Sequence, residues 1–397
     1  MSKPVKVGIT HGDINGVGYE VILGALSCDA IAEMFTPVVF GFYSLAEKCR
    51  RQLGLEELHL QKVKSAAAAQ TGKVNIVDIA GEVPQHEPGR GTPESGKAAV
   101  EALDAAVKAL KAGEIDVLVT APISKEAVQG DSFRFPGHTE YLESCAGEGA
   151  RARMILFDDT VRVALVSTHL PISKVAEAVT RKNVENTIAD LDRSLRMDFG
   201  FERPKIAVLS LNPHAGDGGL LGSEETEVIG PAIKEMRDRG VLAFGPFASD
   251  GFFGMGDYRK FDGVVAMYHD QGLAPFKTLA GERGVNFTAG LPFVRTSPDH
   301  GTAFGIAWKG IADPTSMREA IYKALDIFRN RAVYVEMSAN PLRRYSADKP
   351  DKGERQDRPR PQVVKDKKGS VPQPERMDAE NAAEKIEDNK TTENTES

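Results

Sequence analysis

The fold is decided by the stretch Phe261–Lys277, which reads FDGVVAMYHDQGLAPFK. Its hydrophobic run, Val264–Met267, is typical of a strand that is buried on both faces of a sheet. The run ends just before His269, in a polar segment that the interior of such a strand would not tolerate. The stretch therefore predicts a buried strand that presents a histidine where the strand stops.

The same pattern occurs twice more in the chain. The run Val161–Ser167 leads to His169, and the run Ile206–Leu211 leads to His214. In an open α/β sheet, ligands bind outside the carboxyl ends of the strands. Because imidazoles are common metal ligands, we expect His169, His214 and His269 to hold one divalent metal ion. These histidines are too far apart in the chain for a local zinc motif, so tertiary or subunit contacts must assemble the site.

Alternating strands and helices predict a parallel sheet. The predicted strands also include Val5–Thr10, Pro37–Phe42, Lys73–Ile79, Asp116–Ala121 and Val285–Gly290. The predicted helices are Tyr19–Leu26, Ser44–Leu53, Lys97–Ala112, Ser173–Arg196 and Met317–Met337, with another starting at Pro122. The segment Leu291–Ala303 carries so many turn formers and polar residues that we expect it outside the core.

Composition bounds the class of protein. A length of 397 residues predicts about two domains, and a net charge of −7 without a dense basic stripe argues against nucleic-acid binding. We expect no membrane span, no signal peptide and a cytoplasmic location, and the three cysteines form no CxxC pair. The charged segment 342–397 predicts a disordered tail without a catalytic part.

Three segments allow alternative interpretations. The glycine-rich segment His11–Gly18 lacks the GxGxxG spacing, so it is either a tight strand-to-helix turn or a ligand-facing loop. Thr139 can cap a helix, and His138 just before that helix is well placed to meet an anion. Asp250 is either a carboxylate that supports the site or a turn residue.

Cationic and amide side chains lie near the third histidine in the sequence. Lys277 follows it, Asn286 lies on the next predicted strand, and Arg295 lies beyond that strand. Ammonium and guanidinium groups bind phosphate and carboxylate well. A metal beside such an anion pocket suggests Lewis-acid chemistry on a small phosphorylated hydroxy acid.

Four motifs resemble one family. PGHTEYL, LNPHAGDGG, AMYHDQGL and GLPFVRTSPDHGTAF, in register between Val5 and Met337, resemble the 4-hydroxythreonine-4-phosphate dehydrogenases of pyridoxal phosphate synthesis. The resemblance implies a two-domain α/β fold like that of isocitrate and isopropylmalate dehydrogenases, with an interdomain cleft. It implies a homodimer with shared active sites. The first domain would comprise residues 1–128 and 286–341, and the second domain, residues 129–285, would carry the metal site and dimer interface.

The resemblance also implies roles for individual residues. His169, His214 and His269 match the metal ligands, one of them donated by a partner subunit, with zinc, magnesium, manganese and cobalt all open. Substrate-binding positions are matched by His138, Thr139, Lys277, Asn286 and Arg295. The segment Ser297–Ala312 resembles the NAD-binding loop, with Ser297, His300, Gly301 and Thr302 near the cofactor. Lys277 and Asp270 are candidate proton acceptors, and Asp250 is a candidate orienting group.

The implied activity is the NAD-dependent, metal-dependent oxidation of 4-phosphohydroxy-L-threonine at C3. The β-keto acid would decarboxylate to 3-amino-2-oxopropyl phosphate. A sister dehydrogenase of threonate or erythronate 4-phosphate is the first alternative. A metal-dependent phosphate-ester hydrolase and a binding protein with a degenerate site are the others.

The sequence departs from the family pattern in its first loop and its cofactor loop. The first loop reads THGDINGVGYE, where the family usually has TPGxPAGIGPE. Gly305 and Trp308 stand where the family usually has an acidic residue and a glycine, and Gly251 replaces a usual threonine. These changes leave the contacts to the adenosine ribose, and the choice between NAD and NADP, open.

Overall fold

A computed structural model describes residues 4–79, 83–130 and 133–340 of the chain, and the predicted tail 342–397 lies outside them. Within these residues a 12-stranded sheet runs through the fold. Its strands are β1 (Lys6–Thr10), β2 (Thr36–Gly41), β3 (Leu60–Val63), β4 (Val74–Asp78), β5 (Val117–Thr120), β6 (Arg153–Phe157), β7 (Arg162–Leu165), β8 (Lys205–Leu209), β9 (Leu242–Phe247), β10 (Gly263–Ala266), β11 (Val285–Ala289) and β12 (Val294–Pro298).

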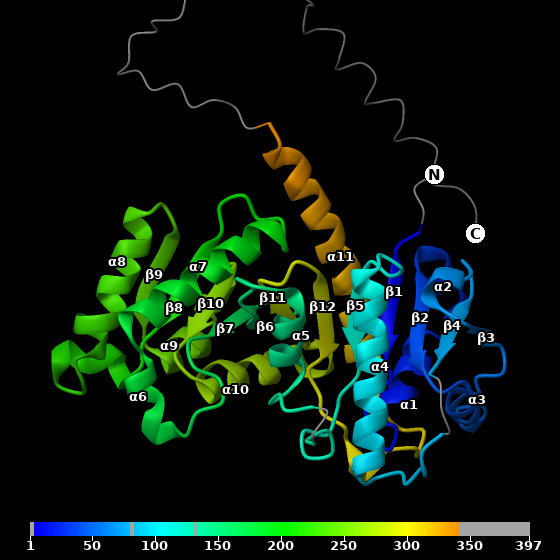
Figure 1. The fold of residues 1–397 in the computed structure, drawn as a ribbon. Coiled ribbons are helices and arrows are strands. Elements are labelled where there is room, and N and C mark those ends of the chain that lie inside the picture. The colour runs from blue at the N-terminus through cyan, green and yellow to red at the C-terminus, as the bar shows by residue number, and fades with distance from the viewer. Residues whose placement is uncertain (1–3, 80–82, 131–132, 341–397) are drawn as a thin grey trace, which may run out of the picture. The chain divides into compact units, whose positions relative to one another are not determined.

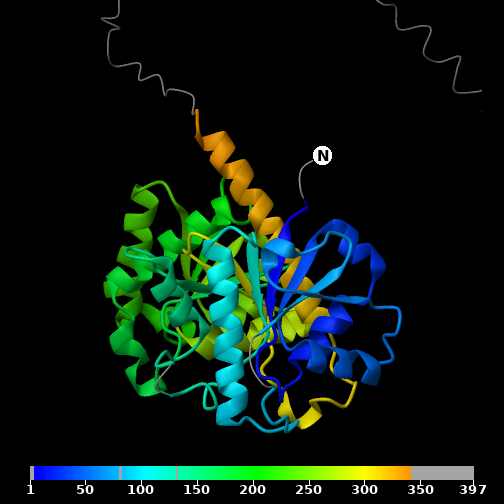
Figure 2. The ribbon, with the colours of Figure 1, turned by 45° about the vertical axis from the view of Figure 1, so that its right-hand side comes forward.

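Helices cover both faces of this sheet (Figures 1 and 2). The strand order is β3-β4-β2-β1-β5-β12-β11-β6-β7-β10-β8-β9. The helices are α1 (Gly18–Ala25), α2 (Asp29–Met34), α3 (Tyr43–Gln52), α4 (Pro93–Lys111), α5 (His138–Ala146), α6 (Val175–Ala178), α7 (Arg181–Met197), α8 (Gly230–Asp238), α9 (Ser249–Gly254), α10 (His269–Ala280) and α11 (Thr315–Ser338).

Alternate residues of each strand enter different cores. Val117 and Val119 of β5 pack in a core that also takes side chains from α1, α7, α8 and α11. Leu118 points to the other face, into a core with α4 and α5. Further along that face, α9 and α10 form a third core with β7, β8 and β10. Both faces of the sheet are therefore buried, which explains the continuous hydrophobic runs in its strands.

The α/β fold is confirmed, but the prediction of a parallel sheet is wrong in the middle of the sheet. Strand β11 pairs antiparallel with β12 and β6, and β6 pairs antiparallel with β7. The short connections between β6 and β7 and between β11 and β12 leave no room for a crossover helix. The remaining strand pairs within the described residues are parallel.

The prediction that Leu291–Ala303 lies outside the core is also wrong. Its residues Val294–Pro298 form β12, a strand that is buried along its whole length between β5 and β11. The polar side chains find partners inside the protein: Arg295 donates to hydroxyls, and the Thr296 hydroxyl donates to the Ala320 carbonyl at 2.7 Å. The polar residues of this segment led to the wrong prediction, because here they are site residues carried by a central strand.

Two predicted helices differ from the observed ones. Ser173–Arg196 is interrupted at Val179 and Thr180, so that α6 and α7 are separate helices. No helix begins at Pro122, where the chain instead forms a turn. No helix in the described ranges, 4–79, 83–130 and 133–340, has the length and apolarity needed to cross a bilayer.

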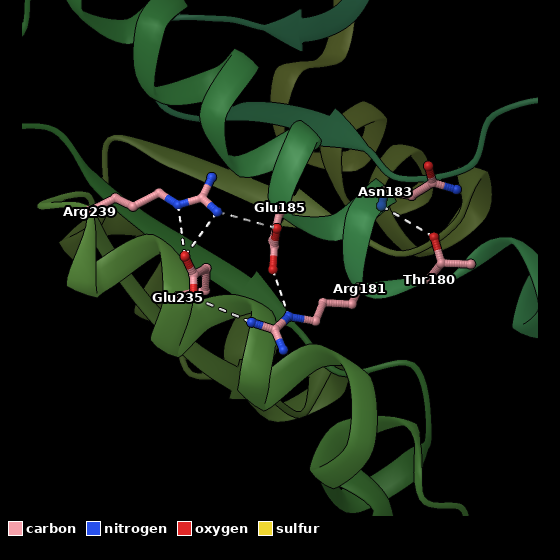
Figure 3. A network of polar contacts seen from close by, with 6 residues as sticks. All are labelled: Thr180, Arg181, Asn183, Glu185, Glu235 and Arg239. Atoms are coloured by element: carbon pink, nitrogen blue, oxygen red, sulfur yellow. Dashed lines mark hydrogen bonds and ion pairs between the residues drawn. The ribbon is translucent and has the colours of Figure 1, made fainter.

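A network of ion pairs joins α7 to the end of α8 (Figure 3). Arg181 pairs with Glu185 at 2.7 Å and with Glu235 at 3.3 Å, and Arg239 pairs with Glu235 at 2.9 Å. The Thr180 hydroxyl caps α7 by accepting from the Asn183 amide. Because both arginines are exposed, the network contributes less than the apolar packing beneath it.

The segment His11–Gly18 is buried throughout, which supports the tight-turn alternative. Gly12 has a φ of 72°, and a Cβ on Gly18 would lie 2.0 Å from the His11 carbonyl oxygen. The His11 ring stacks on Tyr19 at 5.4 Å between centroids, and neither ring nitrogen makes a hydrogen bond of normal geometry within the described chain. Burial lowers the pKa of His11 to about 4, which the Gly12 backbone only partly offsets.

We predict that His11→Phe makes the stability of the protein less sensitive to acid. Between pH 6.5 and 4 the unfolded state takes up a proton at His11 and the folded state does not, so stability falls as the pH falls. The cost reaches about 3 kcal/mol at pH 4. Urea unfolding at pH 7 and pH 4.5 should show a smaller loss for the variant. Equal losses in both proteins would contradict a buried neutral imidazole.

Candidate functional site

The three predicted histidines follow three neighbouring parallel strands. β10 lies between β7 and β8 and pairs parallel with both, so their carboxyl ends meet at one edge of the sheet. His169 follows β7, His269 is the first residue of α10 after β10, and His214 follows β8. The strand-end positions predicted from the sequence are confirmed.

Hydrogen bonds hold these strand ends together. The Gln271 side chain accepts from the Met267 amide at 2.7 Å and donates to the Ser210 carbonyl at 2.6 Å, which links the ends of β10 and β8. The Ser167 hydroxyl donates to the Met267 carbonyl at 2.9 Å, which links the end of β7 to the end of β10. The backbone that carries the histidines is therefore fixed before any ligand arrives.

A pocket of about 250 Å³ lies beside this edge, over the ends of β5 and β12. Of the predicted site residues it brings together His138, Thr139, His169, Asn286, Arg295, Ser297, His300 and Gly301. Its other lining residues include Thr120, Lys125, Glu140, Met154 and Asp299. Predicted residues from four separate segments of the chain thus meet in one small cavity.

Arg295 is the most unusual residue of the pocket. The residue is 2% exposed, and its guanidinium donates to the hydroxyls of Thr120, at 2.6 and 3.1 Å, and of Thr288, at 2.9 Å. It forms no ion pair with a carboxylate of the described residues. Burial lowers its pKa to about 10, so it stays charged at neutral pH. The Glu140 carboxylate, which also lines the pocket, partly offsets this shift. A buried cation whose hydrogen-bond partners are all neutral favours the binding of an anion.

Two other lining groups are polar but uncharged. The Asn286 side-chain oxygen is buried and has no hydrogen-bond partner in the described part of the chain. The pKa of His138 lies well below its ordinary value, first because of burial and then because of the Arg295 and Lys125 cations. Its imidazole is therefore neutral, and the positive charges of the pocket are those of Arg295 and Lys125, beside the carboxyl groups of Glu140 and Asp299 that also line it.

His169 also lines a second cavity of about 300 Å³, together with His269 and Asp270. The rings of His169 and His269 are 6.1 Å apart, and Nδ1 of His269 lies 2.7 Å from the Asp270 carboxylate. Burial and then Lys125 lower the pKa of His169, which favours the neutral form that binds metals. These two imidazoles suit a divalent cation, but no three donors in the described residues of one chain are grouped to hold a metal ion.

His214 lies in neither cavity and is exposed, in a loop of unusual backbone. From His214 to Gly218 five consecutive residues have positive φ, three of them not glycine. Glu225 holds the start of this loop by accepting from the amides of Leu211 and Asn212, both at 2.8 Å. Burial alone would raise the pKa of Glu225, but the hydrogen bonds donated by Asn212 and Leu211 lower it. Strained backbone that is fixed so firmly often marks a functional loop.

Three further predicted residues lie at the margin of the site or away from it. Lys277 forms an ion pair at 3.2 Å with Asp299, which lines the first cavity. Burial raises the pKa of Asp299, and Lys277 opposes that shift. The Thr302 carbonyl accepts from the Val17 amide, and Asp250 is exposed in α9 and lines neither cavity.

Sequence reasoning missed Lys125, Thr120 and Asp299 as pocket residues. Lys125 comes five residues after the end of β5, a strand-end position like those of the histidines. The same strand-end rule could therefore have found it. Thr120 ends β5 and Asp299 directly follows β12, but β12 was not predicted as a strand, and the place of both residues in the pocket depends on the approach of β12 to β5.

The fold and the site define an α/β protein with an anion pocket and paired imidazoles at the carboxyl edge of its sheet. A family model described as pyridoxal phosphate biosynthetic protein PdxA matches residues 33–324. The chain belongs to this family.

Named relatives carry two activities. The 4-hydroxythreonine-4-phosphate dehydrogenase of Bacteroides thetaiotaomicron is 49% identical over 347 residues, which covers 87% of this chain and 95% of that protein. The D-threonate 4-phosphate dehydrogenase of Pectobacterium atrosepticum is 38% identical over 327 residues, which covers 81% and 98%. The crystal structure of the Klebsiella pneumoniae 4-hydroxythreonine-4-phosphate dehydrogenase is 36% identical, covers 82% and 98%, and has a TM-score of 0.71.

We predict that Arg295→Met weakens the binding of inorganic phosphate by at least about tenfold, because hydrogen bonds to charged groups contribute about 1.5–3 kcal/mol. The ligand-free variant should melt at or above the wild-type temperature, since a buried charge without a counter-ion costs stability. Thermal shift against phosphate concentration measures both effects. Arg329→Met, in an exposed pair with Asp326, is the control and should behave like wild type. A phosphate response retained in Arg295→Met would contradict the assignment.

Proposed function

We propose that this chain oxidises 4-phosphohydroxy-L-threonine at C3 with a nicotinamide cofactor and a divalent metal. The β-keto acid product would decarboxylate to 3-amino-2-oxopropyl phosphate. The observation that carries this proposal is the buried Arg295 guanidinium, which faces a cavity lined by His169 as well. The family and the 49% identical dehydrogenase support the reaction class, oxidation of a hydroxyl group on a small phosphorylated substrate.

In this proposal the pocket binds the acidic groups of the substrate. Arg295 and Lys125 would hold anionic oxygens, with Thr139 as a hydroxyl donor. Asn286 and His138 would meet polar groups of the carbon chain. The cavity of about 250 Å³ suits a compact ligand of few carbon atoms. The fixed guanidinium would orient the substrate, because its position is set by Thr120 and Thr288.

The metal site would be completed across a subunit interface. His169 and His269 of one chain would supply two ligands, and His214 from a second copy of the chain would supply the third. This is supported by the closeness of the first two rings and by the exposure of His214 on its rigid loop. When bound, zinc, magnesium, manganese or cobalt would act as a Lewis acid that stabilises negative charge developing on the substrate. The homodimer and its shared active sites belong to this proposal.

Proton transfer is assigned to the edge of the pocket. Lys277, whose pair with Asp299 borders the cavity, is one candidate proton acceptor and would act as the neutral amine. Asp270 is the second candidate, although its contact with His269 suits a role in orienting that ring. The orienting role of Asp250 stays a prediction.

The nicotinamide cofactor would bind along Ser297, His300, Gly301 and Thr302. The first three line the same cavity as Arg295, and the buried Nε2 of His300 has no partner in the described residues. The bound cofactor would accept the hydride from C3. We propose NAD, with NADP as the alternative. The predicted division into a domain of residues 1–128 and 286–341 and a domain of residues 129–285, with the site in the cleft between them, is part of the same proposal.

The sister activity on D-threonate 4-phosphate, or erythronate 4-phosphate, is the second candidate. It is favoured by relatives of that name at 38–39% identity. The anion contacts would serve both substrates, so they do not separate the two activities.

We predict that NADH forms faster, by kcat/KM, with 4-phosphohydroxy-L-threonine than with D-threonate 4-phosphate or erythronate 4-phosphate. Steady-state assays with each substrate and with NAD or NADP measure this preference. Turnover of a sugar-acid phosphate alone would replace the first activity by the second. Phosphate release without any nicotinamide would contradict both and favour a hydrolase.

We predict that His214→Ala lowers metal affinity at least about tenfold and abolishes turnover, as losses of metal-site groups commonly do. Its melting temperature without metal should match wild type, because the side chain is exposed. Metal titration followed by calorimetry and by NADH formation checks this. His59→Ala removes another exposed histidine and should change neither quantity. Full activity of His214→Ala after metal removal would contradict the role of the metal.

A further inference from the structure

Trp308, the single tryptophan of the chain, is buried within the segment that resembles a cofactor loop. Its backbone is in the left-handed region, with a φ of 60°, which a bulky residue rarely adopts. Only 7% of the residue is exposed. The surrounding structure must therefore hold this conformation firmly.

Hydrogen bonds from three elements hold Trp308. The indole N–H donates to the Ile14 carbonyl at 2.9 Å, in the turn before α1. The Glu20 carboxylate, on α1, accepts from the amides of Trp308 and Gly310, both at 2.6 Å. The Gln52 side chain, at the end of α3, donates to the Trp308 carbonyl. We call Glu20, Gln52 and Trp308 the clasp.

The indole is also packed on several sides. The His86 ring meets it edge-on at 4.2 Å between centroids, and the Lys48 ammonium lies 5.4 Å from the ring centroid. The Tyr19 ring is 6.3 Å away. The indole thus fills the space between α1, α3 and the segment around His86, and it presents no free face on which a base could stack.

The loop before Trp308 is docked at two more points. The Val17 amide donates to the Thr302 carbonyl at 3.1 Å. A Cβ on Gly89 would lie 3.2 Å from the Phe304 carbonyl oxygen, so the loop passes close to that backbone. By contrast, a Cβ on Gly301 or Gly305 would meet nothing within 4 Å, so the loop is open on its ligand side.

We propose that the clasp is a positioning device that orders the loop Ser297–Ala307 before a dinucleotide binds. The proposal rests on the proposed function, because it takes this loop as the cofactor wall. Ordering a loop on binding costs conformational entropy. Since hydrogen bonds within the chain alone tie the loop to α1 and α3, that cost is met on folding, and the cofactor meets a formed surface.

The test uses two variants of the full chain. Trp308→Gly removes the indole, and glycine accepts the left-handed backbone without strain. Glu20→Gln keeps the indole and replaces one carboxylate oxygen by a donor that faces a backbone N–H. We expect each variant to bind NADH about tenfold more weakly, equivalent to about 1.4 kcal/mol. The titration follows NADH fluorescence in the presence of metal. KM for NAD should rise while KM for the phosphorylated substrate stays unchanged.

Trp308 supplies a readout that is independent of activity. In Glu20→Gln its emission should shift to longer wavelength as the ring gains contact with water. The matched control is Leu191→Ala, a fully buried position on α7. It should lower the melting temperature as a core truncation does, without changing NADH affinity or emission.

Each outcome decides between the two proposals. Wild-type affinity for NADH in both clasp variants would overturn the clasp while leaving the dehydrogenase intact. A rise in both KM values together would also overturn it, because that pattern indicates general loosening. A wild-type protein that binds neither NADH nor NADPH would remove the proposed function itself.

Discussion

The site depends on the buried charge of Arg295, which forms no ion pair with a carboxylate among the described residues. Arg295 lies in β12, near the middle of the sheet, where its guanidinium donates to two threonine hydroxyls. Burying an ion in this way costs free energy, whereas burying a hydrophobic residue of similar size does not. Binding of an anion beside Arg295 would offset part of this free-energy cost. The negative charge of the substrate would then balance the positive charge of Arg295 at the centre of the sheet.

The second constraint is the alignment of three strand ends. Gln271 and Ser167 tie the ends of β7, β8 and β10 through backbone groups, so the histidines leave the sheet from fixed positions. Two of these rings approach each other, and the third stands on a left-handed loop that faces solvent. In the proposed metal site, a single chain supplies two neighbouring donors. Assembly with a second copy would give the site its final ligand.

Much of this could be predicted from the sequence, and the exceptions have physical causes. Buried strands such as β10 were evident because both faces of the sheet are covered, which produces unbroken hydrophobic runs. β12 was missed because its polar residues are satisfied by partners far apart in sequence, such as Thr120. The strand-end rule found the histidines and could have found Lys125. It could not reveal which of them share one cavity, since that depends on packing between distant segments.

The central claim is that imidazoles from two chains form one metal site, and mixed dimers test it most directly. His169→Ala and His214→Ala proteins, each inactive alone, are unfolded together, refolded as a mixture and assayed for metal-dependent NADH formation. If His214 comes from the partner subunit, half of the dimers regain one intact site of two, and activity returns to about a quarter of wild type. If activity stays absent although mixed dimers form, the ligands do not come from two chains and the account is wrong.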